Sequence, residues 1–128
     1  MTVTHKEIKL IRELLKKSNV DNAEVKTNNE GNEIFIKTDK KNSLVVLTIA
    51  NTFTSITKIK VNVEFTDTEV WSTTLDDGKS FYVKYAMNMV LGEREYLYSD
   101  DGFYWTTIKP KYLQALSNAY KFFKEVSV

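Results

Sequence analysis

The chain lacks several of the residue types on which common catalytic and metal sites depend. It has no cysteine, and His5 is its only histidine. These absences exclude a disulfide, a thiolate metal site and a cysteine nucleophile, and they make a zinc site unexpected. No G-x-S-x-G elbow supplies a serine nucleophile for His5 to activate. We therefore expect no catalytic residue, no metal and no cofactor.

Proline and glycine are also scarce, with one and four residues. No stretch rich in Gly, Pro or Ser divides the chain, so residues 1–128 are expected to form a single domain. Long apolar runs are absent: the longest uncharged run, Asn42 to Thr57, is too polar to cross a bilayer, which takes about 20 mostly apolar residues. No apolar secretory signal follows Met1. We expect no membrane contact and a cytoplasmic location.

Arginine is rare as well, because Arg12 and Arg94 are the only two among 18 basic residues. A bias towards Lys, Asn and Ile is what an AT-rich coding sequence produces. It predicts a low-GC bacterium, or a phage or mobile element of one, as the source. The net charge is +1, so overall charge does not select a nucleic-acid partner.

Two amphipathic helices are predicted to flank a region of strands. Thr4 and Glu7 form a capping box that begins a helix over about residues 4–18. Pro110 suits the first position of a second helix, which is expected to run through Glu125. Each helix has one apolar stripe, and both stripes need an apolar surface to cover them.

Strand patterns fill residues 22–108. The clearest is 58–65, where apolar and polar side chains alternate strictly. Residues 44–49 are a nearly continuous apolar run, predicted as a strand covered on both faces. Asp-Asp-Gly turns at 76–78 and 100–102 indicate hairpins. The prediction is a two-layer α+β fold: a meandering antiparallel sheet of about six to eight strands, with the N-terminal and C-terminal helices packed on one face.

Charge is distributed unevenly along the chain. Residues 1–17 carry five basic and two acidic side chains, residues 109–128 carry four and one, and the stretch between them carries nine and fourteen. Alternate turns of a meander lie at the same edge of a sheet, so the two Asp-Asp-Gly turns are predicted to share one end. The acidic residues there are Asp76, Asp77, Asp100 and Asp101. They belong either to solvated hairpin loops or to a patch that steers a basic partner.

Aromatic residues concentrate late in the chain, with 12 of 16 between Phe81 and Phe123. Side chains alternate faces along a strand, so these rings cannot all point towards one helix-covered side. Tyr and Trp combine a large surface with few rotatable bonds. The predicted interface anchors are Tyr96, Tyr98, Tyr104 and Trp105. Two alternative roles for these rings stay open: filling a curved sheet that buries both faces, and stacking on unpaired bases, which the acidic charge of the segment opposes.

The leading hypothesis is a small non-enzymatic protein-binding module. It would inhibit or sequester a protein partner through this acidic, aromatic hairpin surface, and a basic nucleic-acid-handling protein fits the charge. In size and composition the chain is similar to accessory proteins of phages and mobile elements, including anti-CRISPR and other anti-defence inhibitors, and to bacterial immunity proteins.

Two alternative functions and one alternative partner remain. The basic helices could bind nucleic acid directly, with phosphate contacts from Lys6, Lys9, Lys16, Lys17, Lys111, Lys121 and Lys124. The same lysines would also be expected on the solvated faces of the two helices. A small-ligand pocket or a carboxylate-dependent enzyme site between sheet and helices is the second alternative. An exposed edge strand or aromatic face would also permit a homodimer.

Overall fold

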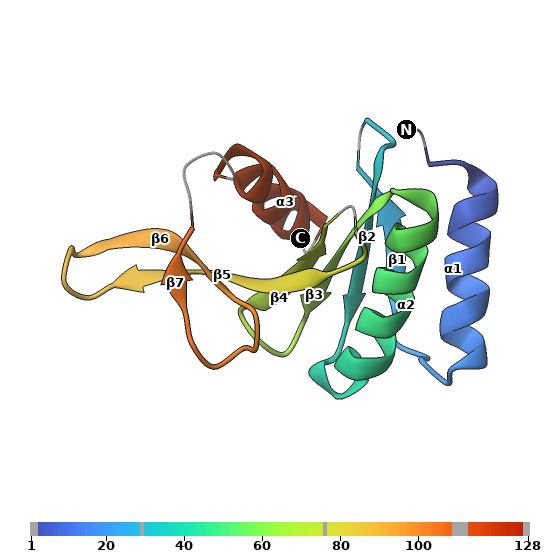
Figure 1. Ribbon diagram of the computed structural model, residues 1–128, viewed down its shortest axis with the longest axis horizontal. Coiled ribbons are helices and arrows are strands. Elements are labelled where there is room, and N and C mark those ends of the chain that lie inside the picture. Colours follow the sequence, from blue (N-terminus) through green and yellow to red (C-terminus); the bar gives the residue numbers. More distant parts are fainter. Residues whose placement is uncertain (1–2, 29, 76, 109–112, 127–128) are drawn as a thin grey trace.

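The computed structural model describes residues 3–28, 30–75, 77–108 and 113–126, and Figure 1 shows its ribbon. The α-helices in this part of the chain are α1 (His5–Lys17), α2 (Ser43–Thr57) and α3 (Leu113–Val126). A 3₁₀ turn, η1 (Lys40–Asn42), leads into α2. The described strands are β1 (Glu24–Thr27), β2 (Glu33–Thr38), β3 (Lys60–Phe65), β4 (Val70–Thr74), β5 (Ser80–Asn88), β6 (Glu93–Ser99) and β7 (Thr106–Thr107). The predicted α+β class is confirmed, whereas Pro110, the expected start of the last helix, lies outside the described residues.

The seven described strands form one sheet and follow one another across it in chain order. Every neighbouring pair is antiparallel except β2 and β3, which run parallel from Glu33 opposite Lys60 to Thr38 opposite Phe65. The predicted antiparallel meander is therefore confirmed except at this pair. Parallel neighbours need a crossover of about a dozen residues or more, and α2 supplies it.

The prediction of a strand at residues 44–49 is wrong, because these residues belong to α2. The buried side chains of this helix recur at helical spacing; they are Val46, Ala50, Phe53 and Thr54. The uncharged, β-branched run that suggested a strand packs against the sheet as a helix, and this tertiary packing outweighs local propensity. Lys58 follows the helix in a left-handed backbone conformation, with φ of 64°.

The two faces of the sheet carry separate apolar cores. Along β2, Ile34 and Ile36 point into the core beneath α1 and α2, whereas Phe35 points into the core beneath α3. Trp71 and Val83 join Phe35 in that second core. Figure 1 shows α1 and α2 on one side of the sheet and α3 on the other. This corrects the expectation that the first and last helices share a face: strands with apolar side chains on both faces need cover on both.

Two local predictions are confirmed. The expected N-terminal helix is α1, and its capping box is present, with the backbone N–H of Thr4 donating to Oε2 of Glu7 at 3.1 Å. The expected alternating strand is β3, which buries its apolar side chains beneath α2. Its opposite face is buried too at Asn62, where the side-chain amide donates to Oε1 of Glu33 at 3.1 Å. Burial of this polar residue is thus matched by a hydrogen bond.

The hairpin of β5 and β6 projects from the body of the protein, and we call it the arm. Its cross-strand pairs run regularly from Tyr82 opposite Ser99 at the base to Asn88 opposite Glu93 beside the turn. In Figure 1 the arm extends past α3 and α2, so no described helix lies over its far end. The loop that follows β6 folds back beside the base of the arm and leads into β7.

Candidate protein-interaction surface

One carboxylate holds the β6–β7 loop, residues 100–105, in shape. Oδ1 of Asp101 accepts hydrogen bonds from the backbone N–H of Phe103 at 2.8 Å, the backbone N–H of Tyr104 at 3.1 Å and the Ser99 hydroxyl at 2.9 Å. The Ser99 hydroxyl oxygen accepts from the backbone N–H of Gly102 at 2.8 Å. These bonds order the loop without a partner strand. Because they favour the ionised carboxylate, the Phe103 bond most of all, they lower the pKa of Asp101 below its usual range.

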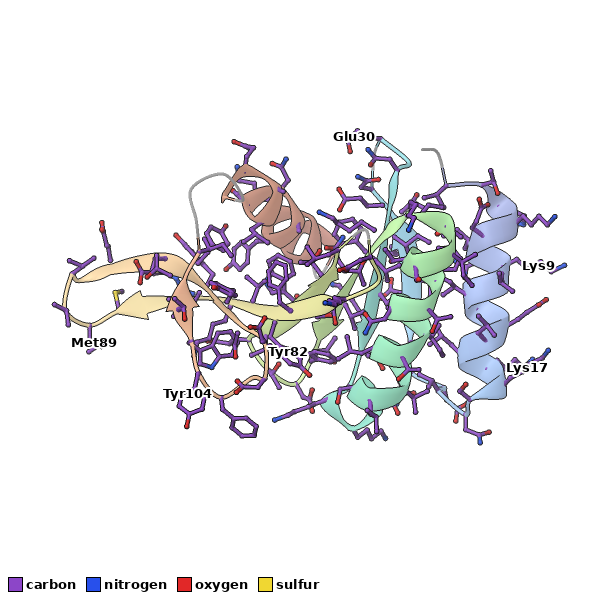
Figure 2. The ribbon with its side chains drawn as sticks, viewed as in Figure 1. Lys9, Lys17, Glu30, Tyr82, Met89 and Tyr104 are labelled. Atoms are coloured by element: carbon purple, nitrogen blue, oxygen red, sulfur yellow. The ribbon has the colours of Figure 1, made fainter. Side chains whose placement is uncertain are left out.

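This ordered loop presents two aromatic side chains to solvent. Phe103 is 84% exposed and Tyr104 is 82% exposed. Figure 2 shows Tyr104 on the outside of the loop, pointing away from the sheet. Large aromatic side chains are typical anchors of protein interfaces. A loop that is ordered before binding also limits the conformational entropy lost on association.

A cleft of about 180 Å³ separates this loop from the start of α2. The sheet contributes Phe65 and Tyr82, η1 contributes Lys40, the start of α2 contributes Ser43, and the loop contributes Phe103 and Trp105. Figure 2 shows Tyr82 between α2 and the loop that carries Tyr104. Aromatic rings thus lie on the floor and the loop side of the cleft, and its charged residues are Lys40 on one wall and Asp101 on the other.

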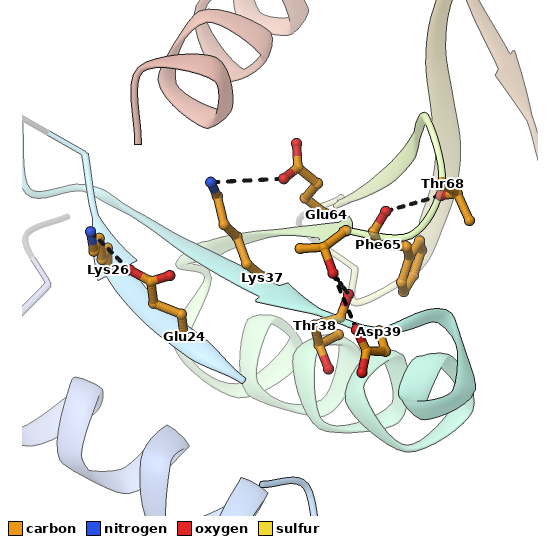
Figure 3. Close-up of polar contacts among 9 residues, drawn as sticks. Glu24, Lys26, Lys37, Thr38, Asp39, Glu64, Phe65 and Thr68 are labelled. Atoms are coloured by element: carbon orange, nitrogen blue, oxygen red, sulfur yellow. Dashed lines mark hydrogen bonds and ion pairs between the residues drawn. The ribbon is translucent and has the colours of Figure 1, made fainter. Parts of the chain in front are cut away.

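Hydrogen bonds fasten the α2 wall of the cleft to the turn after β3. The backbone N–H of Lys40 donates to Oδ1 of Asp67 at 2.9 Å. The Thr66 hydroxyl donates to Oδ1 of Asp39 at 3.2 Å, and the backbone N–H of Thr66 donates to the Thr38 carbonyl at 2.9 Å. Figure 3 shows Thr38 and Asp39 at the end of β2. Both walls of the cleft are thus ordered by local hydrogen bonds.

Trp105, a predicted anchor, forms part of the cleft wall and is half-buried. The ammonium of Lys84 lies 4.3 Å from the centre of its ring. A cation at this distance is attracted to the negative face of the indole. The contact joins the loop to β5 and fixes the orientation of the indole at the cleft.

The structure separates the four predicted anchors. Tyr104 and Trp105 lie in the loop beside the cleft. Tyr96 and Tyr98 lie on the opposite face of the sheet, half-buried against the core beneath α3. The Tyr98 ring packs edge-on against Phe81, with 6.0 Å between ring centres. Tyr104 and Trp105 are therefore the anchors that the structure places in one surface.

Tyr96 belongs to a cluster of aromatic rings under α3. Its ring centre lies 4.5 Å from that of Tyr85 and 6.2 Å from that of Tyr120. Burial raises the pKa of the Tyr96 hydroxyl above its usual value of 10.0, and a hydrogen bond with Ser117 opposes part of that rise. This packing gives Tyr96 a structural role; its role as a partner anchor stays a prediction.

The predicted acidic residues that the structure describes lie in two loops. Asp77 belongs to the β4–β5 turn, where its Oδ1 accepts from the backbone N–H of Lys79 at 2.9 Å, and Asp76 lies outside the described residues. Asp100 is exposed in the β6–β7 loop. Asp101 both orders that loop and lines the cleft. The joint steering role of these carboxylates stays a prediction.

Sequence reasoning did not select two residues of this surface. Phe103 follows an Asp-Gly pair, and that turn signal places it next to a loop tip, but it was not chosen as an anchor. Leu44 is 80% exposed at the start of α2 and follows Ser43, which lines the cleft. Its exposure was not predicted, because residues 44–49 were interpreted as a strand covered on both faces.

The lysines of the alternative nucleic-acid site lie on helices that cover opposite faces of the sheet. Exposed members on α1 are Lys6, Lys9, Lys16 and Lys17, and the exposed member on α3 is Lys121. Lys111 and the side chain of Lys124 lie outside the described part of the chain. Figure 2 shows Lys9 and Lys17 pointing away from the body. The described lysines therefore form two separate solvated faces.

The lone histidine, His5, is exposed at the start of α1 and is not among the residues that line the cleft. Within the described ranges, no cluster of three or more His, Asp or Glu is placed to hold a metal ion. No helix of the described chain has the length and apolar character needed to span a bilayer. Comparisons with protein-family models, with curated protein sequences and with solved structures found no match.

Proposed function

We propose that the chain is a small non-enzymatic protein-binding module that inhibits or sequesters its partner by covering part of the partner's surface. The observation that carries this proposal is the exposure of Phe103 and Tyr104 on a loop that Asp101 holds in one conformation. The two rings stand at the rim of an ordered cleft, so a single partner surface would contact both the rings and the cleft.

The two rings supply enough apolar surface to dominate an interface. Burying about 150 Å² per ring at about 25 cal/mol per Å² contributes about 4 kcal/mol each, before the costs of association. Those costs are several kcal/mol, and ordering a flexible loop would add to them. Because Asp101 already orders the loop, more of the gain from Phe103 and Tyr104 remains as binding free energy.

The charge of the loop favours a basic partner. Asp100 and Asp101 are both exposed, and each adds a carboxylate to the loop. Acidic groups at the rim of an interface mainly raise the association rate with a basic surface. A nucleic-acid-handling protein with a groove lined by Lys and Arg has that charge. The specific form of the proposal is an inhibitor or sequestering protein of phage or mobile-element type, such as an anti-defence protein, or of bacterial immunity type, from a low-GC bacterium and acting in the cytoplasm.

The alternatives have less support from the geometry. Direct binding of nucleic acid would draw on lysines that α1 and α3 place on opposite faces of the sheet. Acid–base catalysis needs two carboxylates at a defined separation. The described lining of the cleft includes one acidic residue, Asp101. Glu64 and Glu69 line a smaller pocket of about 60 Å³ beside Tyr85 and Tyr120, which leaves less room for a substrate.

The proposal is tested by capture from a nuclease-treated lysate of a low-GC bacterium. Three tagged proteins are compared: wild type, the double variant Phe103→Ser/Tyr104→Ser and Ile56→Ser. Ile56 is 76% exposed on α2, so Ile56→Ser is a matched control that removes exposed apolar surface away from the loop. We expect wild type and Ile56→Ser to retain one stoichiometric protein, and the double variant to lose it.

Two outcomes would contradict the proposal. Equal retention by the double variant would move the binding surface away from the loop. In a parallel capture from untreated lysate, retention of nucleic acid alone, released by salt and abolished by nuclease, would instead favour the lysines of the helices.

A further inference from the structure

On the face that carries the cleft, the side chains of the arm differ in charge and polarity from its base to its tip. Lys84 lies on that face, because its ammonium contacts Trp105 in the cleft wall. Residues two apart in a strand share a face, and so do directly paired residues. Ala86, two residues beyond Lys84, pairs with Glu95, so Glu95 and Glu93 also lie on this face. From base to tip the face therefore carries an aromatic cleft, one basic residue and two acidic residues.

The arm ends in apolar side chains, where turns usually carry polar ones. Met89 is 87% exposed, Val90 is 93% exposed and Leu91 is 63% exposed. Figure 2 shows Met89 at the far end of the arm. We call these three residues the arm tip. Contiguous exposed apolar surface of this kind marks an interaction site.

The arm tip and the cleft match in size and chemistry. A cavity of about 150 Å³ accepts a benzene molecule, so the cleft, with about 180 Å³, has room for a side chain such as that of Leu91. Its aromatic lining also suits the sulfur of Met89. The tip lies eight residues beyond Tyr82 in the cleft, which is about 26 Å along a strand. The regular ladder of the arm keeps the tip away from the cleft at its own base.

We infer that two copies of the chain associate through their arms. The arms lie antiparallel with their cleft-bearing faces together, about a two-fold axis near Ala86, so that each tip enters the cleft of the other copy. This arrangement sets Lys84 of each copy opposite Glu93 of the other. Near the axis, Oε1 of Glu95 accepts a hydrogen bond from the Thr107 hydroxyl at 3.3 Å, which holds Glu95 towards β7.

A second copy fits these features better than a lipid surface does. Glu93 and Glu95 flank the apolar tip, and an anionic membrane would repel them. A second copy offers both an aromatic cleft for the tip and Lys84 for Glu93. Self-association goes beyond the proposed function. It occupies the same cleft, so the dimer and the partner complex would compete for that cleft, but the variants that test self-association leave Phe103, Tyr104 and Asp101 unchanged.

The first test is the mass of the purified full chain in solution, measured by sedimentation equilibrium over a range of concentrations. We expect a species of twice the 14.8 kDa chain mass that dissociates on dilution. The double variant Val90→Ser/Leu91→Ser should raise the dimer dissociation constant about tenfold or more, because the tip loses its apolar surface. Ile56→Ser, the matched control on α2, should leave that constant unchanged.

The second test exchanges the charges of the predicted ion pair. Lys84→Glu and Glu93→Lys should each raise the dimer dissociation constant about tenfold, because each places like charges together in both halves of the dimer. Lys84→Glu also removes the contact with Trp105, so the decisive protein is the double variant Lys84→Glu/Glu93→Lys. It should recover most of the wild-type affinity. If the single variants bound weakly because of misfolding or loss of the Trp105 contact, combining them would not restore binding.

Three results would overturn the inference. One is a wild-type chain that stays monomeric at every concentration. Another is a dimer that is indifferent to Val90→Ser/Leu91→Ser or is not restored by the double charge exchange. The third is a monomer that sediments with vesicles of mixed neutral and anionic phospholipid through Val90 and Leu91, which would assign the tip to a lipid surface.

Discussion

The carboxylate of Asp101 and the backbone N–H of Phe103 are joined by a hydrogen bond of 2.8 Å. Through this bond a charged residue of the turn sets the direction in which an exposed phenyl ring leaves the loop. The same oxygen also accepts from Tyr104, so both exposed rings depend on one acceptor. The binding surface is therefore defined by the loop as much as by its aromatic side chains.

Loop order should depend on pH in the acid range. Hydrogen bonds lower the pKa of Asp101 below its usual value of 3.8, so the ordered loop is favoured at all pH values above 3.8 and is lost as pH falls through the lower pKa of the folded state. In an NMR titration, the amide resonances of Phe103 and Tyr104 should shift together with a midpoint below 3.8. Asp101→Asn should abolish this transition. A midpoint at 3.8 or above would show that the carboxylate does not hold the loop.

Gly78 should be the most sensitive glycine in the described chain. Its φ is +86°, and an added Cβ would lie 2.8 Å from the Asn51 carbonyl oxygen and 2.8 Å from Cβ of Ser55. Gly78→Ala should lower the free energy of unfolding by about 2–4 kcal/mol through backbone strain and steric clash. Gly31→Ala, at a φ of +67° with no atom near the added Cβ, should cost about 1 kcal/mol. Equal losses in urea denaturation would mean that the β4–β5 turn does not pack on α2.

The position of α2 can be tested through its buried hydroxyl. Thr54 Oγ1 donates to the Ile59 carbonyl at 2.7 Å and lies 2.8 Å from the hydroxyl of Thr74 in β4. Thr54→Val should lower the free energy of unfolding by about 1–3 kcal/mol, because buried polar groups lose a partner. Thr48→Val, on the exposed side of α2, should change it by less than about 0.5 kcal/mol. In a strand, residues 48 and 54 would lie on the same face, so the two substitutions would not be expected to differ in this way.

Two tyrosines that were predicted as anchors should behave differently. Tyr96→Ala removes a ring packed against Tyr85 and Tyr120 and should lower the free energy of unfolding by about 2 kcal/mol or more. Tyr104→Ala removes an exposed ring and should change it by less than about 0.5 kcal/mol. Thermal or urea denaturation measures both. A stable Tyr96→Ala variant would return Tyr96 to the set of interface candidates.

Local signals predicted much of the fold. The capping box of Thr4 and Glu7 located α1, strict alternation located β3, and Asp-Asp-Gly pairs located the β4–β5 and β6–β7 connections. Each of these features is decided by residues close together in the sequence. The class and the chain-order sheet followed from them.

The predictions from sequence were wrong where contacts between residues far apart in the chain determine the structure. The run from Leu44 to Ile49 is compatible with a strand or a helix, and the need for a crossover between parallel β2 and β3 selects the helix. The placement of α3 on the far face depends on Phe35, Trp71 and Val83, which come from three strands and meet only in the folded sheet. No sequence window contains them together.

Only part of the candidate site was predicted, for the same reason. Tyr104 and Trp105 were selected from the aromatic content of the second hairpin. The cleft between the β6–β7 loop and η1 joins residues about 60 apart in the chain, such as Lys40 and Asp101. Local pattern carries no signal for that pairing, and the face of the sheet on which Tyr96 and Tyr98 lie depended on where α3 packs.

The most direct test of the account is the affinity of the captured partner for three purified proteins, measured by calorimetry: wild type, Phe103→Ser/Tyr104→Ser and Ile56→Ser. We predict that the double variant weakens binding by about 2 kcal/mol or more, roughly 30-fold, with an unchanged melting temperature. Ile56→Ser should bind as wild type does. A double variant that binds within about twofold of wild type would contradict the claim that the β6–β7 loop is the binding surface.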